Sequence, residues 1–80
     1  MSSKLPAVNY RQIIKIAKKL GFHFYRQAKG SHEIWRRAID NRYTTIPHHS
    51  KKDLTRRTLK SIIDDFGITT KEFVKLKSGV

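Results

Sequence analysis

The 80-residue chain contains no cysteine, only two prolines and four glycines, and few acidic residues. Without cysteine no disulfide can cross-link the fold, so stability has to come from packing and from association. No apolar run reaches the roughly 20 residues that cross a bilayer, and the first ten residues lack the apolar stretch of a secretion signal. We therefore expect a soluble, cytoplasmic protein with one domain over residues 1–80, a core over about residues 9–76 and loose ends.

The shortage of acidic residues leaves a large excess of positive charge. Eighteen Lys and Arg face six Asp and Glu, which gives a formal net charge of +12. Residues 1–57 hold 14 basic and 3 acidic side chains, whereas residues 58–80 hold 4 and 3. Such a charge indicates an anionic partner, either nucleic acid or a membrane surface. The cations are spread over several short elements and not along one long amphipathic helix, which favours nucleic acid.

The residues 9–21 are typical of an amphipathic helix with marked ends. Asn9 and Gln12 have the spacing of a capping box, and Gly21 suits a left-handed exit. The apolar residues of this segment share one helical stripe: Ile13, Ile14, Ala17 and Leu20. A second helix ends at Gly67 and a third begins at the capping box of Thr69 and Glu72. The apolar stripe of the second helix is Leu59, Ile62, Ile63 and Phe66, and Phe73 and Leu76 of the third helix are expected to face inward.

Three short strands are predicted between the first two helices, over residues 22–27, 31–39 and 42–46, and Pro47 is expected to end the last one. The turns "AKGS" and "DN" suit antiparallel hairpins. The resulting order, α-β-β-β-α with a short C-terminal helix, indicates an α+β two-layer sandwich with its helices on one sheet face. Strand alternation then directs three apolar residues to the core, Phe22, Phe24 and Ile46, and leaves His23, Tyr25, Tyr43 and Thr45 on an aromatic and basic open face.

The segment "KGSHEIWRR" is the strongest candidate for chemistry. His32 can be an ordinary strand residue, but an imidazole can also take a proton from a ribose 2′-hydroxyl or give one to a leaving 5′-oxygen. Because RNA supplies its own nucleophile, a basic domain needs only such a group and cations that stabilise charge on the phosphorus. Gly30 and Ser31 can bring backbone donors near a phosphate. Four cations surround His32 in sequence: Arg26, Lys29, Arg36 and Arg37.

Other catalytic arrangements find little support. His48 and His49 are adjacent, so on an extended chain their side chains point apart, and neither cysteine nor an E-x-x-H helix completes a zinc site. Asp64 and Asp65 are adjacent on a predicted helix and diverge, so they cannot act as a carboxylate pair. Trp35 and Tyr43 can stack on bases, although strand aromatics more often pack. We expect no metal and no cofactor.

The order of motifs resembles the HicA family of toxins, the small mRNA interferases of HicA-HicB toxin-antitoxin systems. The resemblance is carried by "KKLGF", "RQAKGSHEIW", "TTIPHHSKKDL", "TLKSIIDDFGIT" and "KEF", over roughly residues 9–76. It implies a double-stranded-RNA-binding-domain-like fold, cleavage of mRNA, and neutralisation by a HicB antitoxin that covers the active site. The family's catalytic histidine, in G-S-H, is His32 here. Many members have glycine where this chain has Arg57, so this position can supply an additional phosphate contact.

These observations predict a metal-independent endoribonuclease toxin in which His32 is the general base or the general acid. Its partners are then mRNA and a HicB-type antitoxin, and the isolated chain is expected to be a monomer. The predicted RNA-binding residues are Arg26, Lys29, Gly30, Ser31, Arg36, Arg37, His49, Lys51 and Lys52. Two alternatives stay open at this point: an RNA-binding module of the same fold without catalysis, and a partner-binding protein whose exposed sheet face serves the antitoxin.

Overall fold

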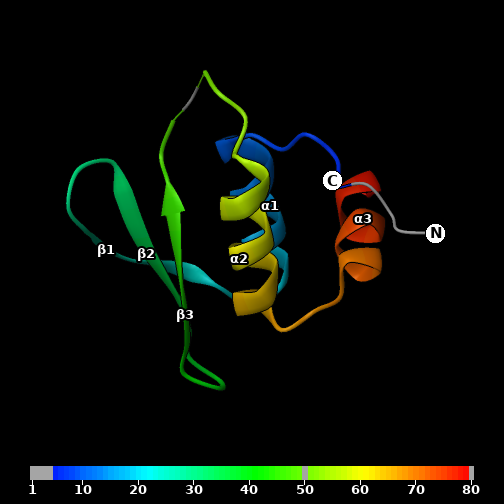
Figure 1. Cartoon of the computed structure of the whole chain (residues 1–80). Helices are drawn as coiled ribbons and strands as arrows, with labels where there is room; N and C mark the ends of the chain where they lie inside the picture. Colours follow the sequence, from blue (N-terminus) through cyan, green and yellow to red (C-terminus); the bar gives the residue numbers. More distant parts are fainter. Residues whose placement is uncertain (1–4, 50, 80) are drawn as a thin grey trace.

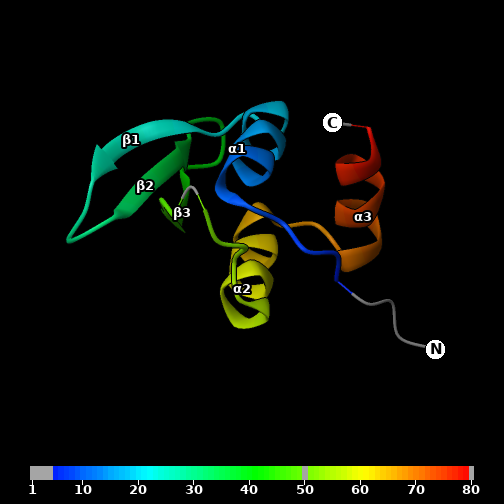
Figure 2. The same ribbon diagram turned by 90° about the horizontal axis from the view of Figure 1, so that it is seen from above.

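A computed structural model describes residues 5–49 and 51–79 of the chain. The elements follow in the order α1 (Tyr10–Lys19), β1 (His23–Gln27), β2 (His32–Arg37), β3 (Arg42–Pro47), α2 (Arg56–Phe66) and α3 (Thr70–Ser78). The strands form one antiparallel sheet in the order β1-β2-β3. Helices α1 and α2 lie beside the sheet, and α3 lies on their far side (Figures 1 and 2). This confirms the predicted α+β class, and it is consistent with a double-stranded-RNA-binding-domain-like fold.

Capping residues set the helix ends as the sequence predicts. Asn9 and Gln12 form a complete capping box at the start of α1, and Thr69 and Glu72 form another at the start of α3. Gly21 and Gly67 follow α1 and α2 with φ of 92° and 77°, a conformation that glycine adopts without strain. Two backbone N–H groups at each capped start therefore find acceptors within the same turn.

The core lies between the sheet and the two helices. Its buried residues are Val8, Ile13, Ile16, Ala17, Phe22, Trp35, Ile46, Leu59, Ile62, Ile63, Phe66 and Phe73. The predicted stripe of α2 is confirmed, and so is the inward position of Phe73. On α1, Ile16 is fully buried, whereas Ile14 and Leu20 are only partly buried and pack against the core. The buried face of α1 therefore includes Ile16, which the predicted stripe left out, and Ile14 and Leu20 lie at its margin.

The prediction that Phe24 points into the core is wrong, because its ring is 51% exposed. It lies opposite Trp35 and meets that ring edge to face at 6.2 Å. However, β1 is an edge strand, and the main contact between helix and sheet is that of α2 with β3 at the other edge. The pairing with Trp35 puts Phe24 on the helix side of the sheet, so alternation assigns its face correctly, and its ring is exposed because it lies on the edge strand away from α2.

Several boundaries also differ from the prediction, since β1 and β2 each begin one residue later than predicted, at His23 and His32. Ala38 and Ile39 were expected in the second strand but belong to the turn that joins β2 to β3. Ile39 is 91% exposed there. Of the ends expected to be loose, residues 77 and 78 complete α3, and residues 1–4 and 80 lie outside the described part of the chain. No helix within the described ranges is long and apolar enough to span a bilayer.

Candidate functional site

A tight hairpin turn carries His32 to the start of β2. Gly30 has φ of 66°, and a Cβ placed on it would meet no atom within 4 Å, so glycine is needed here for backbone conformation and not for space. The Gln27 side-chain amide donates to the carbonyl oxygens of Gly30 and His32, at 3.1 and 3.0 Å. The Ala28 N–H donates to the same His32 carbonyl at 2.8 Å. The backbone of His32 is thereby fixed while its side chain stays exposed.

Two adjoining cavities meet at His32. The first, of about 290 Å³, is lined by His32, Pro47, His49, Lys52, Asp53, Leu54, Thr55 and Thr58. The second, of about 310 Å³, is lined by His32, Thr45, Pro47, Arg57, Thr58 and Ser61. His32 thus lies between a loop that contains residues 48–49 and 51–55 and the first turns of α2. Together the lining residues carry two imidazoles, two cations, several hydroxyl groups and one carboxylate, that of Asp53.

A buried carboxylate lies directly beside His32 in sequence but on the opposite face of β2. Glu33 is 7% exposed. Its Oε1 accepts hydrogen bonds from the Tyr10 hydroxyl at 2.7 Å and from the Trp35 indole N–H at 3.0 Å. The Nδ1 of His48 lies 3.3 Å from Oε2, and the His48 ring stacks on Tyr10 with centroids 3.9 Å apart. Burial and the Glu33 carboxylate raise the pKa of Tyr10 to about 12.

This arrangement separates the two adjacent histidines. His48 turns toward Glu33, whereas His49 lines the cavity and its Nε2 lies 3.4 Å from the Ser31 hydroxyl. The backbone also ties the loop in place, because the His48 N–H donates to the Ser31 carbonyl and the Leu54 N–H to the Val8 carbonyl, each at 2.8 Å. A bridge between Asn9 and Asp53 completes this tether. The loop that carries His49 and Lys52 is therefore held against the His32 turn.

The start of α2 has an unusual charge. Its first turn contains Arg56 and Arg57 and no acidic residue, while the cap is Thr55, whose side chain accepts from the Thr58 N–H. The N-terminus of a helix carries partial positive charge and favours acidic side chains. Two arginines at this end therefore lower the stability of the helix. Arginines at the start of a helix are expected where the site binds an anion.

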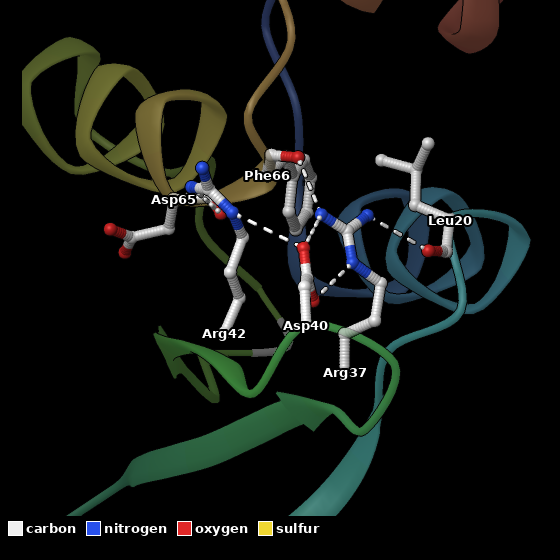
Figure 3. Close-up of polar contacts among 6 residues, drawn as sticks. All are labelled: Leu20, Arg37, Asp40, Arg42, Asp65 and Phe66. Carbon is white, nitrogen blue, oxygen red and sulfur yellow. Dashed lines mark hydrogen bonds and ion pairs between the residues drawn. The ribbon is translucent and has the colours of Figure 1, made fainter.

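Arg37 lies at the other end of β2 from His32, and its guanidinium is engaged in hydrogen bonds and an ion pair (Figure 3). It donates to the last carbonyls of α1 and α2, those of Leu20 at 3.0 Å and Phe66 at 3.2 Å. It also forms a bidentate pair with Asp40, which holds the pKa of that carboxyl below its usual range. Arg42 adds a bond to the Asp65 carbonyl at 3.2 Å. These contacts tie the β2–β3 hairpin to both helix ends, which supports a structural role for Arg37.

The other residues predicted from the sequence fall into three groups. His49 and Lys52 share the first cavity with His32, and exposed Lys51 precedes Lys52 in the same loop. Lys29, Gly30 and Ser31 form the turn before His32. Arg26 and Arg36 lie on the open sheet face, level with Ile34 and Tyr43.

Sequence reasoning missed part of the cavity wall and the residues that support it. Thr45, Thr58 and Ser61 line the second cavity, and Gln27 and Glu33 fix the turn and the strand that hold His32. One signal was available: two arginines directly after a Thr cap contradict the charge preference of a helix start. Glu33 gave no local signal, because its partners Tyr10 and His48 lie far from it in sequence. No cluster of three His, Asp or Glu that could hold a metal occurs within residues 5–49 and 51–79.

Comparison with known proteins agrees with this geometry. A family model for the HicA toxin of bacterial toxin-antitoxin systems matches residues 10–68. The chain belongs to the HicA toxin family. The match spans α1, the sheet and α2, and so includes His32 and both cavities, whereas α3 lies beyond it. As a HicA toxin, the chain has an antitoxin as its partner. A comparison with curated proteins finds no match.

Proposed function

We propose that this HicA toxin is a metal-independent endoribonuclease that cleaves mRNA in the cytoplasm, with His32 as its proton-transfer group. The observation that carries the proposal is the exposed side chain of His32 at the junction of two cavities whose polar lining is mostly cations and hydroxyls, with one carboxylate, that of Asp53. No other exposed titratable side chain of the described residues lines both of them. A histidine titrates near neutrality and can serve as base or acid at cellular pH.

The reaction follows from the chemistry of RNA. The ribose 2′-oxygen attacks the adjacent phosphorus, a bond from phosphorus to the 2′-oxygen forms, and the bond to the 5′-oxygen breaks. A base takes the 2′-hydroxyl proton and an acid gives a proton to the leaving 5′-oxygen. The products are a 2′,3′-cyclic phosphate and a 5′-hydroxyl. His32 supplies one of the two proton transfers.

Charge stabilisation comes from the walls of the cavities. Lys52 and Arg57 flank His32 from the loop and from α2. The hydroxyl groups of Thr58 and Ser61 can donate to phosphate oxygens, and so can His49. Preorganised donors of this kind stabilise the additional charge that develops on a phosphoryl group. We assign Arg26, Lys29, Arg36 and Lys51 to phosphates further along the RNA strand, because they lie on the turn, the open sheet face and the loop around the cavities.

The test is cleavage of an RNA oligonucleotide in the presence of a chelator. We expect products with 2′,3′-cyclic phosphate ends, and no cleavage where the 2′-hydroxyl of the attacked nucleotide is replaced by hydrogen. Cleavage at that nucleotide with an unchanged rate contradicts the proposed reaction. Binding without cleavage favours the alternative of an RNA-binding module of the same fold.

We infer further that the antitoxin is of the HicB type and acts by covering His32 and its cavities. A HicB-type protein added to the toxin should then abolish cleavage, and it should raise the melting temperature by mass action. The isolated toxin is expected to behave as a monomer in sedimentation. Inhibition that leaves RNA access to the cavities unchanged contradicts this mode of neutralisation.

A further inference from the structure

Two large aromatic rings and an arginine form a cluster on the sheet face that the core does not use. Tyr25 and Tyr43 are 52% and 43% exposed, and their rings meet at 5.5 Å with an interplanar angle of 77°. The guanidinium of Arg36 lies 5.9 Å from the centroid of each ring. We call these three residues the Tyr25–Arg36–Tyr43 cluster. Solvent-exposed rings contribute little to the core. Their grouping on one face is therefore typical of a binding surface.

The register places the cluster on the open face of the sheet. Arg36 lies directly opposite Tyr43, and the neighbouring pair, Trp35 and Thr44, is buried on the helix side. The register shift between Phe24 and Arg26 leaves Tyr25 as the additional residue of β1. A bulge of this type re-aims a side chain. Tyr25 lies at this bulge, and its ring meets that of Tyr43.

The open face is also cationic. Glu33 is the single acidic residue among strand residues 23–27, 32–37 and 42–47, and it is buried on the other face. Arg26 and His23 pair in register with Ile34 and Arg36, so they add basic groups around the cluster. The Arg36 Nε donates to Asn41 Oδ1 at 3.1 Å, which holds the guanidinium plane beside the rings. A guanidinium fixed in advance loses less entropy when a ligand binds.

The cluster is connected to the His32 cavities along β2. His32, Ile34 and Arg36 alternate with buried Glu33 and Trp35, so the first three share the open face. Arg36 is four positions along the strand from His32, which is about 13 Å at 3.3 Å per residue. The cluster is therefore too far to touch a phosphate held at His32. It lies within reach of a nucleotide a few positions along the same RNA strand.

We infer that the Tyr25–Arg36–Tyr43 cluster is a base-stacking subsite for unpaired RNA beside the cleavage point. This inference rests on the proposed ribonuclease function. Bases present π-faces on which tyrosine and arginine stack, and such stacking is tolerant of sequence. A duplex keeps its bases stacked inside and cannot offer these faces. The subsite thus selects single-stranded over double-stranded RNA, although related folds bind duplexes by shape.

The experiment measures binding and not cleavage, so that its failure is distinct from that of the proposed function. A fluorescent single-stranded 2′-O-methyl RNA, which cannot react, is titrated with Tyr43→Ala, Tyr25→Ala and Tyr43→Phe. Loss of one stacking ring should weaken binding by about 5- to 150-fold, whereas Tyr43→Phe keeps the ring and stays near the parent. Phe24→Ala is the matched control, because it removes an equally exposed ring of β1 from the opposite face. Circular dichroism melting verifies the fold of each variant.

Duplex RNA and the antitoxin provide the opposing outcomes. The alanine variants should bind a 2′-O-methyl duplex as the parent does. Folded variants that bind single strands with parental affinity overturn the inference, as do equal losses for single strands and duplexes. Loss of antitoxin binding with RNA binding intact also overturns it, because the cluster is then a protein contact. If the parent binds RNA through the cluster but cleaves nothing, the subsite stands and the nuclease proposal fails.

Discussion

His32 has a backbone that is fully engaged and a side chain that supports little of the core. Its carbonyl accepts two hydrogen bonds, from Ala28 and Gln27, whereas its imidazole is exposed at the cavities. Chemistry and folding are therefore separable at this position. The same separation does not hold for its neighbour Glu33, whose carboxylate accepts hydrogen bonds from Tyr10 and Trp35.

Replacing His32 by alanine is expected to lower the cleavage rate by about 10²- to 10⁴-fold, the usual contribution of general acid-base catalysis. The melting temperature and the affinity for a non-cleavable RNA should change little, because many cations carry binding. Rates, melting curves and binding are measured on the same preparation. Lys71→Ala, an exposed substitution on α3 away from the sheet and both cavities, serves as the control. Parental cleavage by a folded His32→Ala chain removes His32 from the mechanism.

The Tyr10 hydroxyl makes stability depend on pH in the alkaline range. Its pKa in the fold is about 12 against an ordinary 10.0, so its contribution is fully present below pH 10 and is lost as pH rises through 12. At neutral pH, Tyr10→Phe should lower the free energy of unfolding by about 1.5–3 kcal/mol, the range for a hydrogen bond to a charged group. The difference in the free energy of unfolding between parent and variant, measured by urea denaturation, should decrease as the pH rises above 10. A difference that stays constant with pH contradicts this account.

Residue by residue, the sequence predicted what depends on near neighbours. The capping boxes of Asn9 and Thr69 and the glycine exits are local, and the structure confirms them. Glu33 could not be anticipated, because the side chains that satisfy it approach only when α1 and the end of β3 meet at β2. Phe24 was misassigned because alternation gives the face of a strand residue but cannot show which strand the helices leave uncovered.

In α2, helix stability and the proposed RNA binding favour opposite charges at the first turn. Its apolar stripe packs on β3, and this part was readable from the sequence. Its start bears Arg56 and Arg57 where a carboxylate stabilises a helix. The loop before it is held by Val8 and Asn9, a long-range tether that no local pattern indicates.

Reversing the charge of Arg57 should move stability and RNA affinity in opposite directions. Arg57→Glu places a carboxylate in the first turn and is expected to stabilise the chain by about 0.3–1 kcal/mol. The same change removes a cation from the second cavity and should weaken RNA binding and cleavage. Lys71→Glu makes an equal charge change in the first turn of α3, at an exposed position that lines neither cavity. Equal effects of both variants on RNA indicate net charge alone and contradict the assignment of Arg57 to the site.

For the whole molecule, charge governs encounter with RNA while a few contacts set its position. Six cations are proposed to contact phosphates: Lys52 and Arg57 at the cavities, and Arg26, Lys29, Arg36 and Lys51 further along the strand. Each contact with a single strand contributes about −0.7 to the slope of log affinity against log salt, so six predict a slope of about −4. Titration of a non-cleavable single strand between low and moderate salt measures this value. A flat response means that the net charge of +12 has no part in binding.

The meander order of the sheet, β1-β2-β3, affects the rate at which the chain folds. Each strand pairs only with its neighbour in the chain, so the pairing steps close short loops, and folds of this kind form quickly. We expect the main phase of refolding after dilution from urea to lie in the millisecond range, measured by Trp35 fluorescence in a stopped-flow instrument. A main phase of seconds or longer contradicts this expectation, whereas a minor slow phase reports isomerisation of the two X–Pro bonds in the unfolded chain. A toxin that folds this fast reaches its native state almost as soon as the ribosome releases it. We therefore expect that the antitoxin has to be present in the cell before the toxin is synthesised.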